Sequence, residues 1–477
     1  MTTPEQSFWS LPGPARFVAD VVAQVLSSHR GIVGIAMPRR MPPGAMDAVR
    51  EALLDRGGGR VVRVRGSDRM FERSIAHGLA YFAGARDGSI RTVAALAESD
   101  AASATTFVVE GVRAADWPRW AAFLRSFAVA SADADRSLAP VVAVCRPAGL
   151  PESAVARLFD QEEVAWRGRV SPLDMRMHVG TLRGHSGRET LLEKIAAETV
   201  VRLAMWDPAI AAAFAELDAR RLVDPEAMVR AAEGSGSDDA PCWENGLVDS
   251  WDGRPAIHLA GCRDSSGARE IRRRSWAAQA EHVLPFVDEV RGFFADRHAG
   301  LLASALPLTM PRKGGDVQVT EPTDLEISPM WRILERAIPP AEETFLRAVV
   351  AMRNLVAHHQ TVSPDVLARV SQAWERLRVE RESVPGWAWP RCGQKLEFIT
   401  DRAPSDALRI DRALPRSAGL DALIRRVHAR LGSGEDAVID GANLTVVERE
   451  RIAAIVPPDI EVVPVVAAPA DRPRKAA

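Results

Sequence analysis

The stretch GIVGIAMPRRMPPGAMDAVREAL, residues 31–53, decides the fold of the first part of the chain. Residues 31–38 are a short apolar run of the kind that makes a buried parallel strand. The loop RRMPPG follows at 39–44, and residues 45–54 have the apolar spacing of a helix. A strand, a loop and a helix in this order predict one unit of a parallel α/β sheet.

The same alternation continues on both sides of this stretch. Residues 14–28 have helical spacing, and further apolar runs at 60–64, 105–111 and 139–147 predict strands. The segments between these runs predict helices over 74–85, 89–97 and 117–132. Strands that alternate with helices to about residue 180 predict a parallel sheet covered by helices.

Beyond residue 180 the pattern becomes mainly helical, and 477 residues exceed what one hydrophobic core usually serves. We therefore expect a multidomain α/β plus α protein. Its charged segment 263–275 is interpreted as a connector, and the Trp- and Pro-rich segment 386–401 as irregular. The expected parts are an α/β domain (1–180), a helical lid-like region (181–235), a linker with two short strands or a compact loop (236–275), a helical domain (276–385), a small β-α-β region (386–466) and a disordered tail (467–477).

Composition narrows the classes of function. The net charge of −2 gives no global case for nucleic-acid or membrane surfaces, and only four basic residues are lysines, a usage that most simply reflects a GC-rich genome. The four cysteines form no CxxC pair, which argues against a zinc site, and no metal is expected. There is no signal-peptide pattern and no uncharged apolar run of membrane-spanning length. These features predict a cytoplasmic protein with no membrane partner.

The loop after the first strand has part of a phosphate-binding motif. Gly44 stands where a loop glycine is needed, but Ala45 and Met46 stand where Lys and Ser/Thr belong. No lysine precedes Lys194, so none can replace the missing one. The strand TTFVVEG, residues 105–111, is similar to a Walker B strand that has kept a single acid, Glu110.

Residues 15–180 thus resemble the core of an AAA/STAND-type P-loop ATPase that has lost its catalytic residues. The resemblance implies a degenerate nucleotide site at Gly44, Arg39, Arg40 and Glu110. It predicts no ATPase activity and leaves nucleotide binding without hydrolysis open, so the domain is expected to be a scaffold or a nucleotide sensor. The alternative is an unrelated doubly wound α/β domain.

A second motif lies in FLRAVVAMRNLVAHHQTVS, residues 345–363. The segment RNLVAH, from Arg353 to His358, ends an apolar helix, and helices are expected around it over 325–336 and 364–379. Residues 276–385 resemble a HEPN domain, a small helical bundle that in many proteins is a metal-independent ribonuclease. The resemblance implies catalytic roles for Arg353, Asn354 and His358, an RNA substrate and a homodimer.

The chemistry fits these residue types. Metal-free RNA cleavage needs one group that moves the 2′-hydroxyl proton and a cation that stabilises charge on the phosphate, roles that suit His358 and Arg353. Asn354 would position the phosphate or the histidine. We therefore expect a bacterial conflict protein, of the antiviral-defence or toxin type, that cleaves or binds RNA. The alternatives are that these residues only cap helices, and that the chain is a non-enzymatic adaptor with protein partners.

Overall fold

The computed structural model describes most of the first 383 residues and part of the rest. The chain forms two compact units, residues 1–373 and 374–477. The described residues are 4–57, 59–85, 88–132, 139–150, 155, 158–159, 162–184, 189–233, 239–310, 315–383, 395–399, 408, 419–420, 422–424, 426–427, 430, 437–440, 444, 448, 452 and 461–465. Among them, no helix combines the length and the apolar character needed to cross a membrane.

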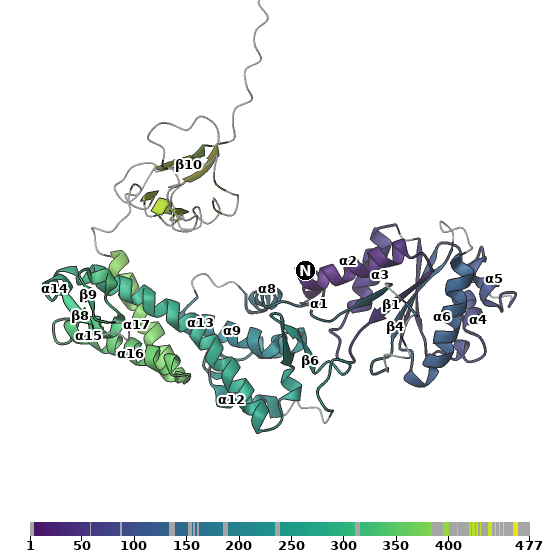
Figure 1. Cartoon of the computed structure of the whole chain (residues 1–477), viewed down its shortest axis with the longest axis horizontal. Helices are drawn as coiled ribbons and strands as arrows, with labels where there is room; N and C mark the ends of the chain where they lie inside the picture. The colour runs from purple at the N-terminus through teal and green to yellow at the C-terminus, as the bar shows by residue number, and fades with distance from the viewer. Residues whose placement is uncertain are drawn as a thin grey trace, which may run out of the picture. The chain divides into compact units, whose positions relative to one another are not determined.

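A five-stranded parallel sheet organises the first part of the chain (Figure 1). Its order is β2-β3-β4-β1-β5, so β1 lies between β4 and β5. Each neighbouring pair is parallel, which confirms the expected α/β layout. The strands are β1 (Ile32–Ala36), β2 (Arg60–Arg65), β3 (Thr105–Glu110), β4 (Val141–Arg146) and β5 (Glu163–Ala165).

Helices cover both faces of this sheet (Figure 1). On one face α2 (Pro12–Ser27) packs against α3 (Ala45–Asp55), beside the short α1 (Pro4–Trp9). On the other face lie α4 (Ile75–Phe82), α5 (Val93–Ala97) and α6 (Trp117–Ala132), which share a core with Phe107 of β3. Helix α5 is shorter than predicted, because the Thr92 hydroxyl accepts a hydrogen bond from the Ala95 amide and begins the helix there.

A group of helices and one hairpin follow the sheet. Helices α8 and α9 each begin with a capping box, formed by Ser171 with Asp174 and by Thr190 with Glu193. The hairpin of β6 (Val248–Trp251) and β7 (Arg254–Ile257) is antiparallel, which agrees with the first of the two alternatives predicted for this segment, two short strands or a compact loop. The helices are α8 (Pro172–Arg183), α9 (Leu191–Ala204), α10 (Pro208–Ala215), α11 (Ala219–Leu222) and α12 (Pro225–Glu233).

The long helix α13 (Ser265–Arg297) corrects one prediction. Residues 263–275 were interpreted as a connector before a helix at 276, but the helix already begins at Ser265, where the Asp264 carboxylate accepts a hydrogen bond from the Gly267 amide at 2.7 Å. The charges are spaced as helical ion pairs: Glu270 meets Arg273 three residues on and Arg274 four residues on. The charged run therefore forms the first turns of a helix and is not a connector.

Three of the helices described between α13 and residue 383 were predicted. They are α15 (Ile327–Leu334), α16 (Pro340–Ala357) and α17 (Pro364–Ser383), and both α15 and α16 pack on α13. The short α14 (Ala299–Ser304) and an antiparallel pair, β8 (Leu308–Met310) and β9 (Val317–Val319), lie between α13 and α15. Gln279 of α13 is fully buried and binds backbone groups of Val223 and Val362, so it ties two loops to this helix.

The second unit contains a three-stranded parallel sheet of order β11-β10-β12. The outer strands β11 (Ala437–Asp440) and β12 (Glu461–Val465) lie in the region 386–466, where a small β-α-β unit was expected. The central strand β10 (Lys395–Ile399) falls in the segment interpreted as irregular, which corrects that prediction. A small core of Leu423, Ile439 and Ile452 is part of this unit. The helix expected in the β-α-β region falls largely outside the described residues, and the tail from 467 falls wholly outside them.

Candidate functional site

The RNLVAH segment lies at the C-terminal end of α16. The Arg353 guanidinium is half-buried; it donates a hydrogen bond to the Asn354 side-chain oxygen at 3.2 Å and lies 3.5 Å from the Glu326 carboxylate. Asn354 and His358 are exposed. The His358 backbone amide ends the helix by donating to the carbonyls of Asn354 and Leu355, both at 3.1 Å. In the part of the chain that is described, no hydrogen bond or ion pair occupies the His358 ring.

Arg353 and His358 point in different directions around the helix axis. Residues five apart on an α-helix are separated by about 140°, since each residue turns the helix by about 100°. No hydrogen bond or ion pair between the two side chains is present among the described residues. One copy of the chain thus presents a cation and an imidazole at the same helix end, but not on one face.

An aromatic pair covers the same helix end. His359 has φ +57, and this left-handed conformation turns the chain away after α16. Its ring lies 4.4 Å from the Trp276 ring of α13 at an angle of 30°. The Trp276 indole N–H donates to the Val356 carbonyl at 3.0 Å, which satisfies one of the unpaired carbonyls at the helix terminus. Trp276 therefore anchors α13 to α16 and also offers a partly exposed ring.

A small cavity of about 580 Å³ lies beside this pair, and three arginines of α13 line it. Arg272 makes two hydrogen bonds to Glu226 (2.6 and 2.9 Å), and Arg273 makes two to Glu270 (2.7 Å each). Arg269 is exposed, and no ion partner for it is present among the described residues. The lining is Pro225, Glu226, Arg269, Arg272, Arg273, Trp276, Leu355, His359, Gln360 and Thr361.

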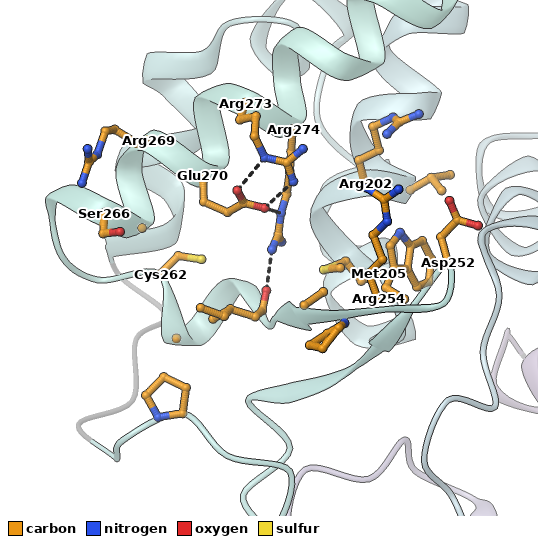
Figure 2. Close-up of a pocket in the computed structure, with 18 of the residues that line it drawn as sticks. Arg202, Met205, Asp252, Arg254, Cys262, Ser266, Arg269, Glu270, Arg273 and Arg274 are labelled. Carbon is orange, nitrogen blue, oxygen red and sulfur yellow. Dashed lines mark hydrogen bonds and ion pairs between the residues drawn. The ribbon is translucent and has the colours of Figure 1, made fainter.

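A larger pocket of about 1370 Å³ lies next to this cavity and shares two of its arginines (Figure 2). Arg269 and Arg273 line both pockets. Figure 2 shows Ser266, Arg269, Glu270, Arg273 and Arg274 of α13 along one wall, and Arg202, Met205, Asp252 and Arg254 along the facing wall. The first turns of α13, helix α9 and the β6–β7 hairpin therefore enclose a space rich in charged groups.

Arg274 is the buried centre of the α13 wall, with 4% of its surface exposed. It donates to the Glu270 carboxylate at 2.9 Å and to the Ile257 carbonyl at 2.6 Å, while its Nη1 has no hydrogen-bond partner. Hydrogen bonds from Arg273 and then from Arg274 lower the pKa of Glu270 to about 2 against the effect of burial. The burial of Arg274 shows that residues 272–274 are not simply a solvated basic patch.

The facing wall is held by a network that joins α8, α9 and α13. The Glu198 carboxylate is 4% exposed and accepts from Arg176 at 2.9 and 3.1 Å. Arg202 lies 2.8 Å from the same carboxylate. Both arginines also pair with Glu281 of α13. Because every charge in this network has an opposite neighbour, its members position the wall and are not free to take a ligand without losing a partner.

The residues predicted for a nucleotide site lie at the loop after β1 and at the end of β3. Gly44 has φ +82 and begins α3, and the Pro43 carbonyl accepts a hydrogen bond from the Trp9 indole at 2.7 Å. Arg39 and Arg40 are exposed. The Arg39 amide donates to the Glu244 carbonyl at 2.9 Å, so the segment around 244 covers the loop.

The Glu110 carboxylate is engaged by Arg63 of β2, which also reaches Asp47 of α3 at 2.6 Å. The hydrogen bond to Glu110 raises the pKa of the Arg63 guanidinium. No hydrogen bond or ion pair joins Glu110 to Arg39 or Arg40 among the described residues, which also contain no group of three or more possible metal ligands. The structure thus does not bring the four predicted residues together as one contact set.

Sequence reasoning missed Arg269, Trp276 as a partner of His359, and both pockets. The signal was available in part: Arg269, Arg273 and Trp276 are spaced four and three residues apart, as on one helix face. Because residues 263–275 were interpreted as a connector, this helical spacing was not recognised. Comparison with models of known protein families and with curated proteins gives no match, so no relative assigns a function to these residues.

Proposed function

We propose that the chain binds single-stranded RNA at the C-terminal end of α16 and, as a homodimer, cleaves it there without a metal ion. The observation that supports this proposal is the position of Arg353, Asn354 and His358 at an exposed helix end, next to a stacked Trp276–His359 pair and an arginine face of α13. Aromatic rings stack on unpaired bases, and arginines bind the phosphates between them.

The cleavage step would use the 2′-hydroxyl of the RNA. His358 would remove its proton as the 2′ oxygen attacks the adjacent phosphorus. Because Arg353 and His358 of one copy do not share a helix face, the Arg353 that stabilises the charge on the phosphate oxygens would come from the second copy. The leaving 5′ oxygen then needs a proton from an acid. The corresponding histidine of a second copy can supply it, which gives a chemical reason for a homodimer.

Two features of the helix end suit these roles. Arg353 and Glu326 are 3.5 Å apart, with 38% and 46% of their side chains exposed. An ion pair this exposed contributes little stability, so a phosphate can replace the carboxylate at small cost. The exposed His358 ring is also accessible to a substrate.

The first domain is proposed to be a P-loop-like scaffold or sensor in a bacterial conflict protein. The topology around β1 supports this proposal. The chain leaving β1 crosses β4 and β3 to reach β2 at one edge of the sheet, whereas the chain leaving β4 crosses β1 to reach β5 at the opposite edge. Ligands of open α/β sheets bind where neighbouring connections diverge in this way. The pairing of Glu110 with Arg63 favours a scaffold over an ATPase, because the Glu110 carboxylate is held in an ion pair and is not available to act on a nucleotide.

A non-enzymatic adaptor is the second candidate, and it too has one observation in its favour. Glu326 lies beside Arg353, so the cation that would stabilise the transition state has a carboxylate neighbour in the free chain. In an adaptor, Arg353 and Asn354 would serve only to hold the end of α16 against α15.

The test compares the wild type with Arg353→Ala and His358→Ala, and uses Arg332→Ala on the exposed face of α15 as the matched control. Cleavage of labelled single-stranded RNA is measured in EDTA, and growth is followed on induction in bacteria. The proposal expects both site variants to lose at least about a hundredfold in rate, while Arg332→Ala keeps full activity. If wild type leaves RNA intact and growth unaffected, the ribonuclease proposal is wrong and the adaptor replaces it.

A further inference from the structure

We propose that the large pocket between α13, α9 and the β6–β7 hairpin binds a small phosphorylated ligand with a planar ring, of the mononucleotide class. The pocket is distinct from the end of α16, and the inference does not depend on RNA cleavage. Its volume of about 1370 Å³ is ample for a ligand of this size together with bound water.

The buried Arg274 is the first reason. Buried polar groups in proteins almost always have hydrogen-bond partners, and an unpaired donor on a cation is costly. Two of the Arg274 nitrogens are satisfied by Glu270 and by the Ile257 carbonyl, but Nη1 has no partner, and the residue lines the pocket. Nη1 itself is covered by protein atoms, so an oxygen of an anionic ligand would satisfy this donor after a small shift of the pocket wall; a guanidinium matches the geometry of a phosphate.

The charge balance of the lining is the second reason. Seven arginines and six carboxylates line the pocket, and the carboxylates of Glu198, Glu270 and Glu281 are already paired with arginines. Arg254 is exposed on β7, and no ion partner for it is present among the described residues. It therefore remains available to a ligand anion, on the wall that faces Arg274 (Figure 2).

The planar part of the ligand is inferred from the hairpin. Among the described residues of the lining, Trp251 is the only aromatic one, and it pairs across the hairpin with Arg254. An indole face beside a guanidinium can hold a ring and the phosphate attached to it. Asp252, at the turn of the hairpin with φ +52, adds an acceptor suited to the hydroxyls of a sugar. Phosphate, sugar and ring together define a mononucleotide.

The test uses the full chain without RNA or magnesium and measures binding by calorimetry. The probes are AMP, GMP, CMP and UMP, with adenosine and inorganic phosphate as the two halves of a nucleotide. At least one mononucleotide should bind at least tenfold more tightly than either half. Arg254→Ala should weaken that binding about tenfold or more, as expected for loss of a charge-assisted contact. Trp251→Leu should weaken nucleotide binding but leave phosphate binding unchanged.

Two controls separate this proposal from folding defects and from the ribonuclease proposal. Arg125→Ala removes an exposed arginine of α6, outside the pocket, and should bind the nucleotide as the wild type does. Arg353→Ala and His358→Ala should also keep nucleotide binding. The proposal is overturned if none of the four mononucleotides binds, or if Arg254→Ala binds them with wild-type affinity. Arg274→Lys, checked for an unchanged unfolding midpoint, should lose binding as well, and full retention would equally overturn the proposal.

Discussion

Replacement of Gln279 by leucine should cost about 3 kcal/mol of unfolding free energy. Gln279 is fully buried; its side-chain oxygen accepts from the Val362 amide at 2.7 Å, and its amide donates to the carbonyls of Val362 at 3.1 Å and Val223 at 3.3 Å. Val362 is 1% exposed, so water cannot replace the lost partner there. Each buried group left unpaired costs about 1–3 kcal/mol, and burial of the leucine returns about 1 kcal/mol.

The assay is urea unfolding at pH 7, followed by far-UV circular dichroism and by tryptophan fluorescence. Gln372→Leu is the matched control, because Gln372 is exposed on α17 and its replacement should change stability by less than about 0.5 kcal/mol. A loss below about 1 kcal/mol for Gln279→Leu, with an unchanged denaturant slope, would refute the reasoning. It would mean that the loops at 223 and 362 find other partners.

Three further predictions concern pH, charge and nucleotide chemistry. His178 of α8 is buried and its pKa is lowered by desolvation, so its stability contribution is present above pH 6.5 and is lost as the pH falls through the lowered folded value. Unfolding temperatures at pH 7 and pH 5 should therefore differ less in His178→Gln than in wild type. Glu270→Gln should lower the unfolding free energy by about 2 kcal/mol at pH 7, because the buried Arg274 then lacks the opposite charge of Glu270. The pKa of Glu270 is about 2 in the folded chain and 4.5 in the unfolded chain. The difference in unfolding free energy between wild type and Glu270→Gln should therefore shrink as the pH falls from 4.5 toward 2, and urea unfolding at pH 7 and at pH 3 measures it. ATP with magnesium should release no phosphate, and activity that disappears in Glu110→Gln would contradict the scaffold reading.

Elements with a simple burial pattern could be predicted from the sequence. Strands β1, β3 and β4 are buried from both faces of the sheet and therefore appear as continuous apolar runs. The start of α13 could not be recognised in the same way, because its first turns carry charges whose partners are partly on the same helix and partly on α12. Strand β10 was missed because it stands next to a Trp- and Pro-rich stretch, and its pairing depends on strands distant in sequence.

In the candidate site too, the features set by local spacing could be predicted, and those set by tertiary packing could not. Arg353 and His358 are five residues apart, so their position at one helix end follows from local periodicity. The contact of Trp276 with His359 and with Val356 joins residues about 80 positions apart, and only tertiary packing creates it. The burial of Arg274 likewise depends on the β6–β7 hairpin, because the Ile257 carbonyl that it binds belongs to that hairpin.

Helix α13 is about 50 Å long, since each of its 33 residues adds about 1.5 Å along the axis. Pro285 interrupts the backbone hydrogen bonds inside this helix, because it has no amide hydrogen to donate to the Glu281 carbonyl four residues earlier. The side chain of Glu281 is held there by Arg176 and Arg202. These ion pairs connect α13 to α8 and α9 at the turn where the proline removes a backbone hydrogen bond. Loss of the Glu281 carboxylate is therefore expected to make the helix most flexible at this turn.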